Sequence, residues 1–356
     1  MPKKLMLHIG HPKTGSSFLQ SVLALNNGLL AEHGFNYLDH GSNSRASHGE
    51  ITSGNGDIFH SFLEDHSRAA TTLGDIHVFS KEKLFFDFTR PDFQGKFTSL
   101  IEDGFYDEIG ILLYIRDPVS WRASAFQQNL KRGSKGAIDV SLMFEEVVLP
   151  IQVNQCLDFF EQIPIVTVKI LNYVVVRSSL LNSFADWLGI DERLFVSPEK
   201  RVINRSMTSS ELMLLTVLKN FRGEVNNFVS SALCQQLPDV EADVILPSLE
   251  SQNTLWDRLS TQIDRANARI EPEQRYDRAR DIQLPKNYRE TAEFSRAQIG
   301  VIADCIATLN QRLNNSHRHN LELSNRLAET RERNVAMLAQ IEDLRARIVK
   351  LRGDPA

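Results

Sequence analysis

The sequence is poor in cysteine and has no long apolar run. Its three cysteines, Cys156, Cys234 and Cys305, lie far apart without CxxC spacing or neighbouring histidines, which argues against a disulfide framework and against a zinc site. No stretch of 18 apolar residues occurs, so no integral membrane segment is predicted. The apolar run after the first lysines is too short for the core of a signal peptide. We expect a soluble protein of a reducing cytoplasm.

An excess of positive charge is also absent. The formal net charge is −5 and the pI is near 6.1, so no nucleic-acid partner is predicted and any site for a polyanion must be local. With 42% hydrophobic residues in 356, the chain is long enough for one large domain, or for one domain with an appendage.

Short apolar runs alternate with helical patterns along the first half of the chain. Strands are expected over residues 4–11, 76–80, 109–116 and 163–170, and helices over 16–34, 118–131 and 142–161. This alternation predicts an α/β fold, a P-loop-like three-layer domain whose mainly parallel central sheet is flanked by helices. The segments at His11, Lys81 and Arg116 would then meet beyond the carboxyl ends of the strands.

The rest of the chain is organised differently. Residues 41–57 are rich in Gly, Ser, Asn and Asp and predict a long loop, which we place over the substrate side of the crevice. From residue 205 onward the pattern is helical, with breaks near Pro238, Pro247, Pro272 and Pro285. The predicted domains are 1–300, with its core motifs in 1–215 and a helical remainder in 216–300, and a C-terminal helix over 301–356.

A seven-residue repeat runs through the last segment. Its core positions are Ile306, Leu313, Asn320, Leu327, Asn334, Ile341 and Ile348, together with Leu309, Ser316, Leu323, Thr330, Met337, Leu344 and Leu351. Such a repeat predicts a coiled coil that makes a homodimer or docks the chain on a partner, and asparagine at the first core position favours two strands. A single amphipathic helix packed on its own domain is the alternative.

The stretch "GHPKTGSS" after the first strand has the glycine spacing of a phosphate-binding loop, but its lysine is Lys13 and no lysine follows Gly15. Backbone N–H groups in such a loop, and the helix N-terminus behind it, bind anions. Lys13 would lie over the loop, and Ser16 and Ser17 would offer hydroxyls to a phosphate. An ordinary structural turn is the alternative interpretation.

A second segment, "RDPVSWRAS", follows the strand predicted at 109–116. Asp117 and Pro118 suit the N-cap and first residue of a helix, on which Ser120 and Ser124 share a face. Arg116 and Ser124 could therefore point at one anion. Alternatively, Arg116 pairs with Asp117 on the surface, and Ser124 bonds to its own helix.

Together the two segments resemble the sulfotransferases that use 3′-phosphoadenosine 5′-phosphosulfate. "PKTGSSF" is similar to the first motif of that family, and an arginine followed eight residues later by a serine is similar to the second. The resemblance implies that Lys13 contacts the oxygen bridging phosphate and sulfate and that Thr14, Gly15, Ser16 and Ser17 hold the 5′-phosphate. It also implies that Phe18, where the family usually has Trp, stacks on adenine, and that Arg116 and Ser124 bind the 3′-phosphate.

The resemblance leaves the general base and one basic ligand open. Carbohydrate sulfotransferases often use a glutamate in the region of "SKEKL", which makes Glu82 the first candidate base, although it could instead be a solvated carboxylate paired with Lys81 or Lys83. His11 and His48 are rival bases because imidazole titrates near neutral pH. A later loop of the family contacts the 3′-phosphate, which points to Arg205, with Arg201 nearly equivalent.

The predicted function is in-line transfer of a sulfuryl group to a hydroxyl or amine of a carbohydrate or glycolipid. No metal is expected, because the leaving group is a phosphate monoester and no acidic cluster is present. A non-catalytic sulfotransferase-like scaffold that binds nucleotide or glycan is the main alternative. A P-loop kinase or NTPase is less favoured, because the lysine after Gly15 is missing.

Overall fold

A computed structural model describes residues 3–38, 54–67, 75–133, 147–198, 205–219, 223–243, 245–285 and 291–352. The chain divides into two compact units, Met1–Ser295 and Arg296–Ala356.

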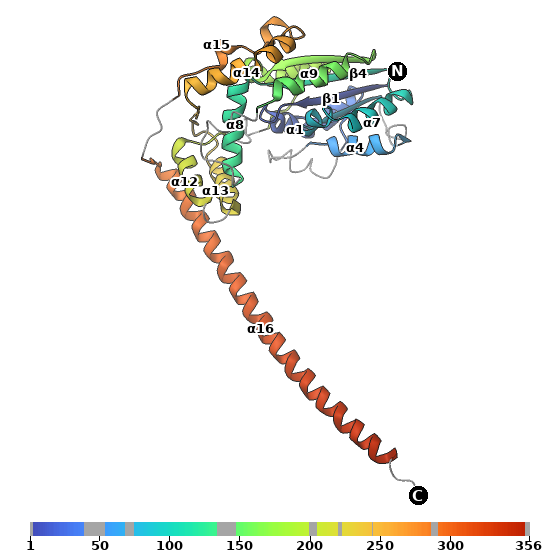
Figure 1. Ribbon diagram of the computed structural model, residues 1–356, viewed down its shortest axis with the longest axis vertical. Helices are drawn as coiled ribbons and strands as arrows, with labels where there is room; N and C mark the ends of the chain where they lie inside the picture. The colour runs from blue at the N-terminus through green and yellow to red at the C-terminus, as the bar shows by residue number, and fades with distance from the viewer. Residues whose placement is uncertain are drawn as a thin grey trace. The chain divides into compact units, whose positions relative to one another are not determined.

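The first unit is built on a sheet of five parallel strands in the order β2-β3-β1-β4-β5 (Figure 1). The strands are β1 Lys4–Gly10, β2 Phe35–Asn36, β3 Ile76–Ser80, β4 Glu108–Ile115 and β5 Val166–Asn172. The central strand β1 pairs with both β3 and β4, so the loops that follow these three strands open at one edge of the sheet. The predicted parallel α/β fold is confirmed, with the two-residue strand β2 as an addition.

Helices cover both faces of this sheet and make three layers. The described helices of the first unit are α1 Ser16–Leu25, α2 Asn27–Glu32, α4 Gly56–Glu64, α6 Lys83–Asp87, α7 Pro91–Glu102, α8 Pro118–Lys131, α9 Leu149–Phe160, α10 Tyr173–Val176, α11 Leu180–Leu188, α12 Ser209–Lys219, α13 Gly223–Gln236, α14 Leu249–Asn267 and α15 Arg278–Asp281. Of these, α12 and α13 pack against α8 and each other. Short 3₁₀ segments occur at η2 Arg177–Ser179, η3 Glu192–Leu194 and η4 Pro272–Gln274.

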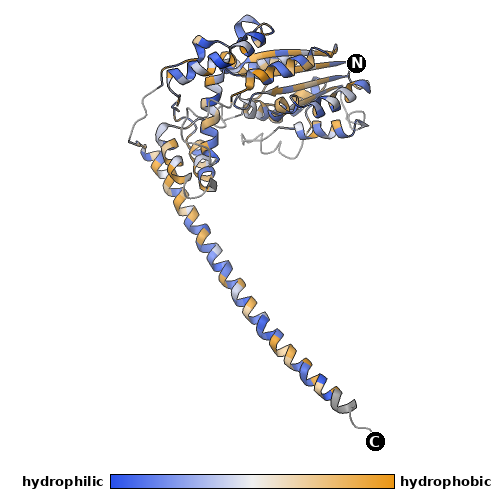
Figure 2. Cartoon of the chain, viewed as in Figure 1, coloured by the Kyte–Doolittle hydropathy of each residue, from blue (hydrophilic) through white to orange (hydrophobic). Residues whose placement is uncertain are grey.

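Two hydrophobic clusters separate the layers. Alternate residues of β4 point to opposite faces, so Ile111 and Leu113 join a cluster with α4, α6, α7, α9 and α14, while Leu112 and Tyr114 join another with α1, α2 and α11. Figure 2 shows the apolar strands between helices that are apolar on their inner sides. A sheet buried on both faces fixes its strand ends rigidly, and the candidate site is built on those ends.

The helix expected over 16–34 is broken at Asn26. This buried side chain donates from Nδ2 to the Val196 carbonyl at 2.8 Å, and its Oδ1 accepts the Val196 N–H at 2.8 Å. The partner lies 170 residues away in the sequence, so helical periodicity alone could not reveal the break. The chain leaves α2 through Gly34, whose φ is +81°.

Other predicted elements differ only at their ends. Helix α8 matches the predicted 118–131, whereas α9 begins at Leu149, and residues 142–146 of that prediction lie outside the described residues. Strand β5 starts three residues later than the predicted 163. The expected breaks near Pro238, Pro247 and Pro272 fall between α13, α14 and α15.

Residues 41–53 of the expected long loop lie outside the described residues. Its last part packs on the end of β3. Asn55 is buried, accepts the Ser80 N–H at 2.9 Å and donates to the Val78 carbonyl at 2.9 Å. Gly54, at φ +68°, lies so close to Ser80 that an added Cβ would be 1.9 Å from its carbonyl oxygen. This segment therefore packs against Ser80 and Lys81 at the end of β3.

The second unit contains the 57-residue helix α16, Arg296–Arg352. Every described side chain from Asn310 to Ile348 is exposed. Within the described ranges, no helix combines the length and apolar character that crossing a bilayer requires.

Candidate functional site

The loop between β1 and α1 contains two residues with left-handed backbones. Lys13 has φ +73° and Gly15 has φ +82°. Lysine rarely adopts a left-handed backbone, so neighbouring residues must stabilise this conformation of Lys13. The His11 N–H donates to the Tyr114 carbonyl at 2.9 Å, and the Thr14 hydroxyl donates to the His11 carbonyl at 2.7 Å. The Thr14 side chain thus forms a hydrogen bond within the loop itself.

The two glycines of the loop are needed for packing as well as for conformation. A Cβ on Gly10 would lie 2.9 Å from the Tyr114 carbonyl oxygen on β4. A Cβ on Gly15 would lie 2.5 Å from Leu180 Cδ2 and 3.1 Å from the Tyr173 ring. The glycine spacing noted in the sequence therefore reflects how closely the loop approaches β4, α10 and α11.

Arg116 joins the two predicted motifs directly. Its Nη1 donates to the Lys13 carbonyl at 2.8 Å, its Nε donates to the Ser120 hydroxyl at 2.8 Å, and its guanidinium lies over the Tyr173 ring at 5.4 Å. Within the described part of the chain Nη2 makes no hydrogen bond to protein, so it can still bind an anion. Burial lowers the pKa of Arg116, yet a guanidinium stays charged at any physiological pH.

His11 is fully buried beneath this contact. Its Nδ1 accepts the Arg116 N–H at 3.1 Å, and its ring packs edge-on against Phe85 at 4.9 Å. Burial, followed by the charge of Arg116, lowers the pKa of His11 to about 3, so the imidazole is neutral. Through its hydrogen bond with the Arg116 N–H, the His11 side chain joins the ends of β1 and β4. The role of His11 as a base stays a prediction.

The Lys13 ammonium reaches toward α8. Its Nζ donates to Gln128 Oε1 at 3.1 Å, and Gln128 lies four residues beyond Ser124 and eight beyond Ser120 on one face of that helix. Burial, followed by the charge of Lys131, lowers the pKa of Lys13 to about 8. Gln128 was not among the predicted site residues, although its spacing from Ser124 could have indicated it.

Glu82 lies in the short connection between β3 and α6, at the N-cap position of α6. Burial raises the pKa of its carboxyl, while the Ser16 hydroxyl and the Lys13 charge act in the opposite direction. Its neighbour Lys81 forms an ion pair with Asp57 instead. Glu82 is therefore a half-buried carboxylate beside Lys13. The alternative, a solvated carboxylate paired with Lys81 or Lys83, does not describe it.

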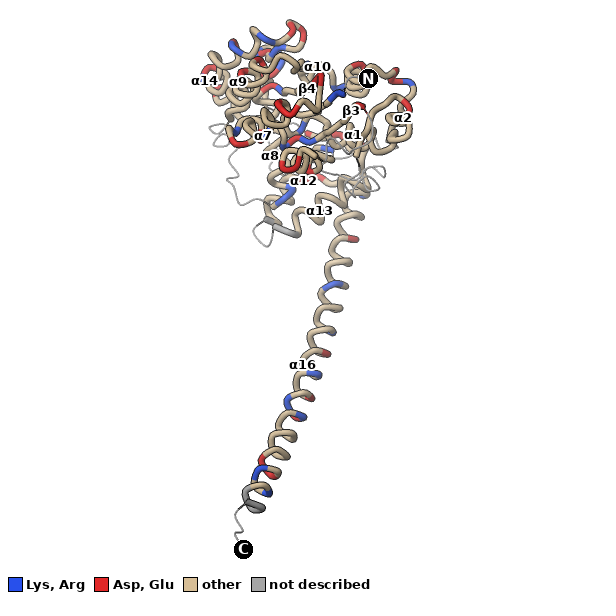
Figure 3. The backbone as a smooth tube through the Cα atoms, turned by 90° about the vertical axis from the view of Figure 1, so that its right-hand side faces the viewer, with Lys and Arg blue, Asp and Glu red and all other residues tan. Residues whose placement is uncertain are grey.

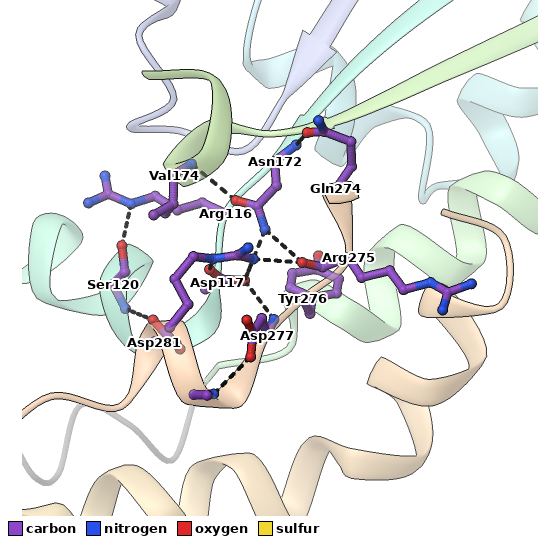
Figure 4. A network of polar contacts seen from close by, with 12 residues as sticks. Arg116, Asp117, Ser120, Asn172, Val174, Gln274, Arg275, Tyr276, Asp277 and Asp281 are labelled. Atoms are coloured by element: carbon purple, nitrogen blue, oxygen red, sulfur yellow. Dashed lines mark hydrogen bonds and ion pairs between the residues drawn. The ribbon is translucent and has the colours of Figure 1, made fainter. Parts of the chain in front are cut away.

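The N-terminus of α8 is capped from a distant part of the chain (Figure 4). Asp281 of α15 accepts the N–H groups of Val119 and Ser120, both at 2.8 Å, and the Trp256 indole N–H at 2.9 Å. Asp117, at the N-cap position, instead accepts from Arg280 Nε at 2.8 Å and from Asn172 Nδ2 at 2.9 Å. Asp117 and Pro118 thus hold the predicted N-cap and first helical positions, but the side chain that caps the helix is Asp281. The alternative pairing of Asp117 with Arg116 is replaced by its contacts with Arg280 and Asn172.

The remaining predicted donor ligands line the same loop and helix. Ser16 is buried and Ser17 half-buried at the start of α1, and Ser124 is half-buried on α8. Phe18 is half-buried and packs against the cluster under α1 and α11. These residues lie on α1 and α8, and their contacts with a nucleotide stay predictions.

Two further predicted residues lie apart from this group. Arg205 is buried, with all five of its N–H donors used: Glu211 accepts two at 2.7 and 2.8 Å, and the carbonyls of Ser206, Leu233 and Leu237 accept the others. Arg205 therefore holds α12 to α13 rather than presenting a free donor to a phosphate. His48 and Arg201 lie outside the described residues.

No protein-family model matches the chain, and a comparison with curated proteins gives no match. Among solved structures, a "Sulfotransferase Domain from the Curacin Biosynthetic Pathway" is similar at 15% identity and a TM-score of 0.32, over 73% of this chain and 98% of that one. Retinol dehydratase "in complex with androsterone and inactive cofactor PAP" is similar at 12% identity and a TM-score of 0.31, over 75% and 81%. These values are too low for the likeness to indicate an activity.

Proposed function

We propose that the chain is a sulfotransferase that takes its sulfuryl group from 3′-phosphoadenosine 5′-phosphosulfate. One observation carries the proposal: the hydrogen bond from Arg116 to the Lys13 carbonyl joins two motifs 103 residues apart at the edge of a parallel sheet. A phosphate loop whose lysine lies inside it, held by an arginine at the next strand end, suits a donor with a single 5′-phosphate and a second, remote phosphate.

The donor is a substrate with two anionic ends. Backbone N–H groups of the loop, with Ser16 and Ser17, would hold the 5′-phosphate at the N-terminus of α1. Arg116 and Ser124 would hold the 3′-phosphate, because Arg116 Nη2 is still available and Ser124 follows Ser120 on the same face of α8. Burial of Arg116 and Lys13 strengthens both contacts by reducing solvent screening.

Glu82 would accept the proton of the acceptor hydroxyl or amine. The acceptor atom forms a bond to sulfur as the bond from sulfur to the bridging oxygen breaks, and the electron pair stays on the 5′-phosphate. Lys13, beside Glu82, would stabilise that developing charge. A carboxylate whose pKa burial raises toward neutral pH is a better base than an exposed one.

The proposed acceptor is a carbohydrate or glycolipid, which a glutamate base would suit. A non-catalytic domain that binds nucleotide or glycan is the second candidate, since donor-binding residues alone do not require transfer. Transfer of sulfate to a glycan panel, measured beside binding of 3′,5′-bisphosphoadenosine, separates the two.

Three variants sharpen this test. Glu82→Gln should bind the bisphosphate with little change and lose about 10²- to 10⁴-fold in transfer, as expected for a general base. Lys13→Ala should lose both transfer and affinity. Lys83→Ala, an exposed lysine next to Glu82, is the matched control and should retain both. Tight binding without transfer to any glycan by the unmodified chain would favour the binding role.

A further inference from the structure

The apolar stripe of α16 is a solvent-exposed surface that the proposed function does not use. Between residues 306 and 348, nine of the thirteen heptad core positions are apolar. Exposed fractions include 67% for Leu313, 54% for Leu327 and 56% for Leu344. An isolated helix gains little stability from its own hydrogen bonds, so a stripe of this length indicates a partner helix. Figure 2 shows the apolar residues recurring along α16.

The positions that flank this stripe carry one sign of charge. Two positions of each heptad border the core, and between residues 310 and 347 these twelve positions hold six arginines, two histidines, and one each of Asn, Ser, Gln and Leu. The six are Arg312, Arg326, Arg331, Arg333, Arg345 and Arg347. None of the twelve is acidic, although the segment contains acidic residues.

The acidic residues of the segment lie on the other side of the repeat. Glu322, Glu329, Glu332, Glu342 and Asp343 all occupy outer heptad positions. One of them, Asp343, pairs with Arg347 along the helix at 3.0 Å. Figure 3 shows these charges along α16. Since flanking residues set partner choice in coiled coils, this separation of charge bears directly on which helix can cover the stripe.

A second copy of the chain is disfavoured by these charges. In a parallel pair, each flanking residue meets the flanking residue of the next heptad in the partner, so Arg326 would face Arg331 of the other copy twice. In an antiparallel pair, like positions meet, and arginines again face arginines. Like charges set opposite each other suppress association.

An anionic membrane surface fits the stripe less well than a helix does. Asn320 and Asn334 interrupt it at core positions, where a second helix can satisfy their amides. Helix α16 also contains no Trp, Phe or Tyr, the residues that anchor interfacial helices. The acidic outer face would further oppose binding to anionic lipid.

We infer that α16 docks an acidic helix of another protein, forming a two-stranded coiled coil whose partner carries Glu or Asp at its flanking positions. Of the two predicted uses of the repeat, these charges favour docking on a partner over homodimerisation. The inference does not depend on the proposed sulfotransferase activity, and its test uses no activity readout.

The test uses the full chain and peptides of residues 306–348. The acidic peptide carries Arg→Glu at all six flanking arginines, the native peptide is unchanged, and a serine peptide adds Leu323→Ser, Leu327→Ser, Ile341→Ser and Leu344→Ser to the acidic one. The full chain should be monomeric by light scattering and should bind only the acidic peptide. Its Kd should weaken about tenfold or more between low and high salt, because screening removes the attraction.

A charge swap in the chain supplies the reciprocal test. Arg326→Glu, Arg331→Glu and Arg333→Glu together alter only exposed positions, and should weaken the acidic peptide while creating binding to the native one. A dimer of the unmodified chain that the native peptide dissociates would overturn the inference. So would failure to bind the acidic peptide, or binding to phosphatidylserine vesicles that the acidic peptide does not block.

Discussion

The Arg116 guanidinium donates to the Lys13 carbonyl across 2.8 Å, from the end of β4 to the loop after β1. This contact holds Lys13 in its left-handed conformation, at φ +73°. The same guanidinium donates to Ser120 on α8. One side chain therefore sets the loop, the helix and the proposed 3′-phosphate site relative to each other.

The first prediction concerns removal of the Arg116 side chain, which contacts both the loop and α8. Arg116→Ala should weaken 3′,5′-bisphosphoadenosine by about 100-fold, because a charged hydrogen-bond donor contributes roughly 1.5–3 kcal/mol. Adenosine 5′-phosphosulfate should weaken less, by about tenfold, through loss of the Lys13 contact alone. Isothermal titration calorimetry with both ligands measures the difference.

Ser124→Ala is the control that removes one proposed phosphate contact without touching the loop. It should weaken the bisphosphate by about tenfold, and adenosine 5′-phosphosulfate hardly at all. Equal losses for the two ligands in Ser124→Ala would contradict the assignment of this face of α8 to the 3′-phosphate.

The second prediction concerns pH. In the proposed mechanism, transfer requires Glu82 ionised and Lys13 protonated. Burial raises the pKa of Glu82, so kcat/KM should rise with pH through a value above the usual carboxyl range of about 4.5. Burial lowers the pKa of Lys13 to about 8, so kcat/KM should fall above that pH. A bell-shaped profile is expected.

Binding measurements isolate the alkaline side of this profile. In Glu82→Gln, the Glu82 charge no longer raises the pKa of Lys13, so affinity for 3′,5′-bisphosphoadenosine should fall by up to about tenfold per pH unit, beginning at or below pH 8, as Lys13 loses its proton. Lys13→Arg, which stays charged, should abolish that fall, and Lys83→Arg should leave it unchanged. A fall that persists in Lys13→Arg would assign the titration to another group.

The sheet and the first half of the site could be predicted because the signals are local. A glycine loop after an apolar run, and an arginine followed by a Pro-started helix, place Lys13 and Arg116 at neighbouring strand ends by general rules of parallel sheets. The order of strands, β1 between β3 and β4, then brings Glu82 to the same edge.

Long-range polar contacts could not be predicted in this way. Asp281 caps a helix that begins 163 residues earlier, and Asn26 ends a helix by bonding to Val196. Neither pairing leaves a periodic or spacing pattern in the sequence. Arg205 could not be placed for a related reason. Its partner Glu211 is close in the sequence, but the burial of Arg205 depends on how α12 and α13 pack.

The third prediction tests the remote cap. Asp281→Ala would leave two backbone N–H groups of α8 and the Trp256 indole without their acceptor, so the free energy of unfolding should fall by about 2–4 kcal/mol. Asp277→Ala is the matched control, since Asp277 is an exposed cap of the four-residue α15. It should cost about 1 kcal/mol or less. Urea denaturation followed by circular dichroism measures both.

The same carboxyl predicts a pH dependence of stability. Burial, followed by the charge of Asp117, raises the pKa of Asp281 to about 7. The folded chain therefore binds a proton that the unfolded chain has released between about pH 4 and 7, and its contribution to stability declines as pH rises through that range. Asp281→Asn should flatten this decline. An unchanged pH dependence would show that Asp281 does not titrate there.

The fourth prediction concerns the conformation of the loop. In Gly15→Ala the new Cβ would meet Leu180 at 2.5 Å, and alanine would have to adopt φ +82°, a conformation that costs a non-glycine residue roughly 1–2 kcal/mol before any clash. We expect the loop to shift and the affinity for 3′,5′-bisphosphoadenosine to fall about 100-fold. Gly28→Ala has nothing within 4 Å and lies in α2, so it should be neutral or slightly stabilising. If Gly15→Ala bound the bisphosphate as tightly as Gly28→Ala does, the loop could not be the phosphate site, because its backbone N–H groups bind an anion only while Gly15 holds them at the N-terminus of α1.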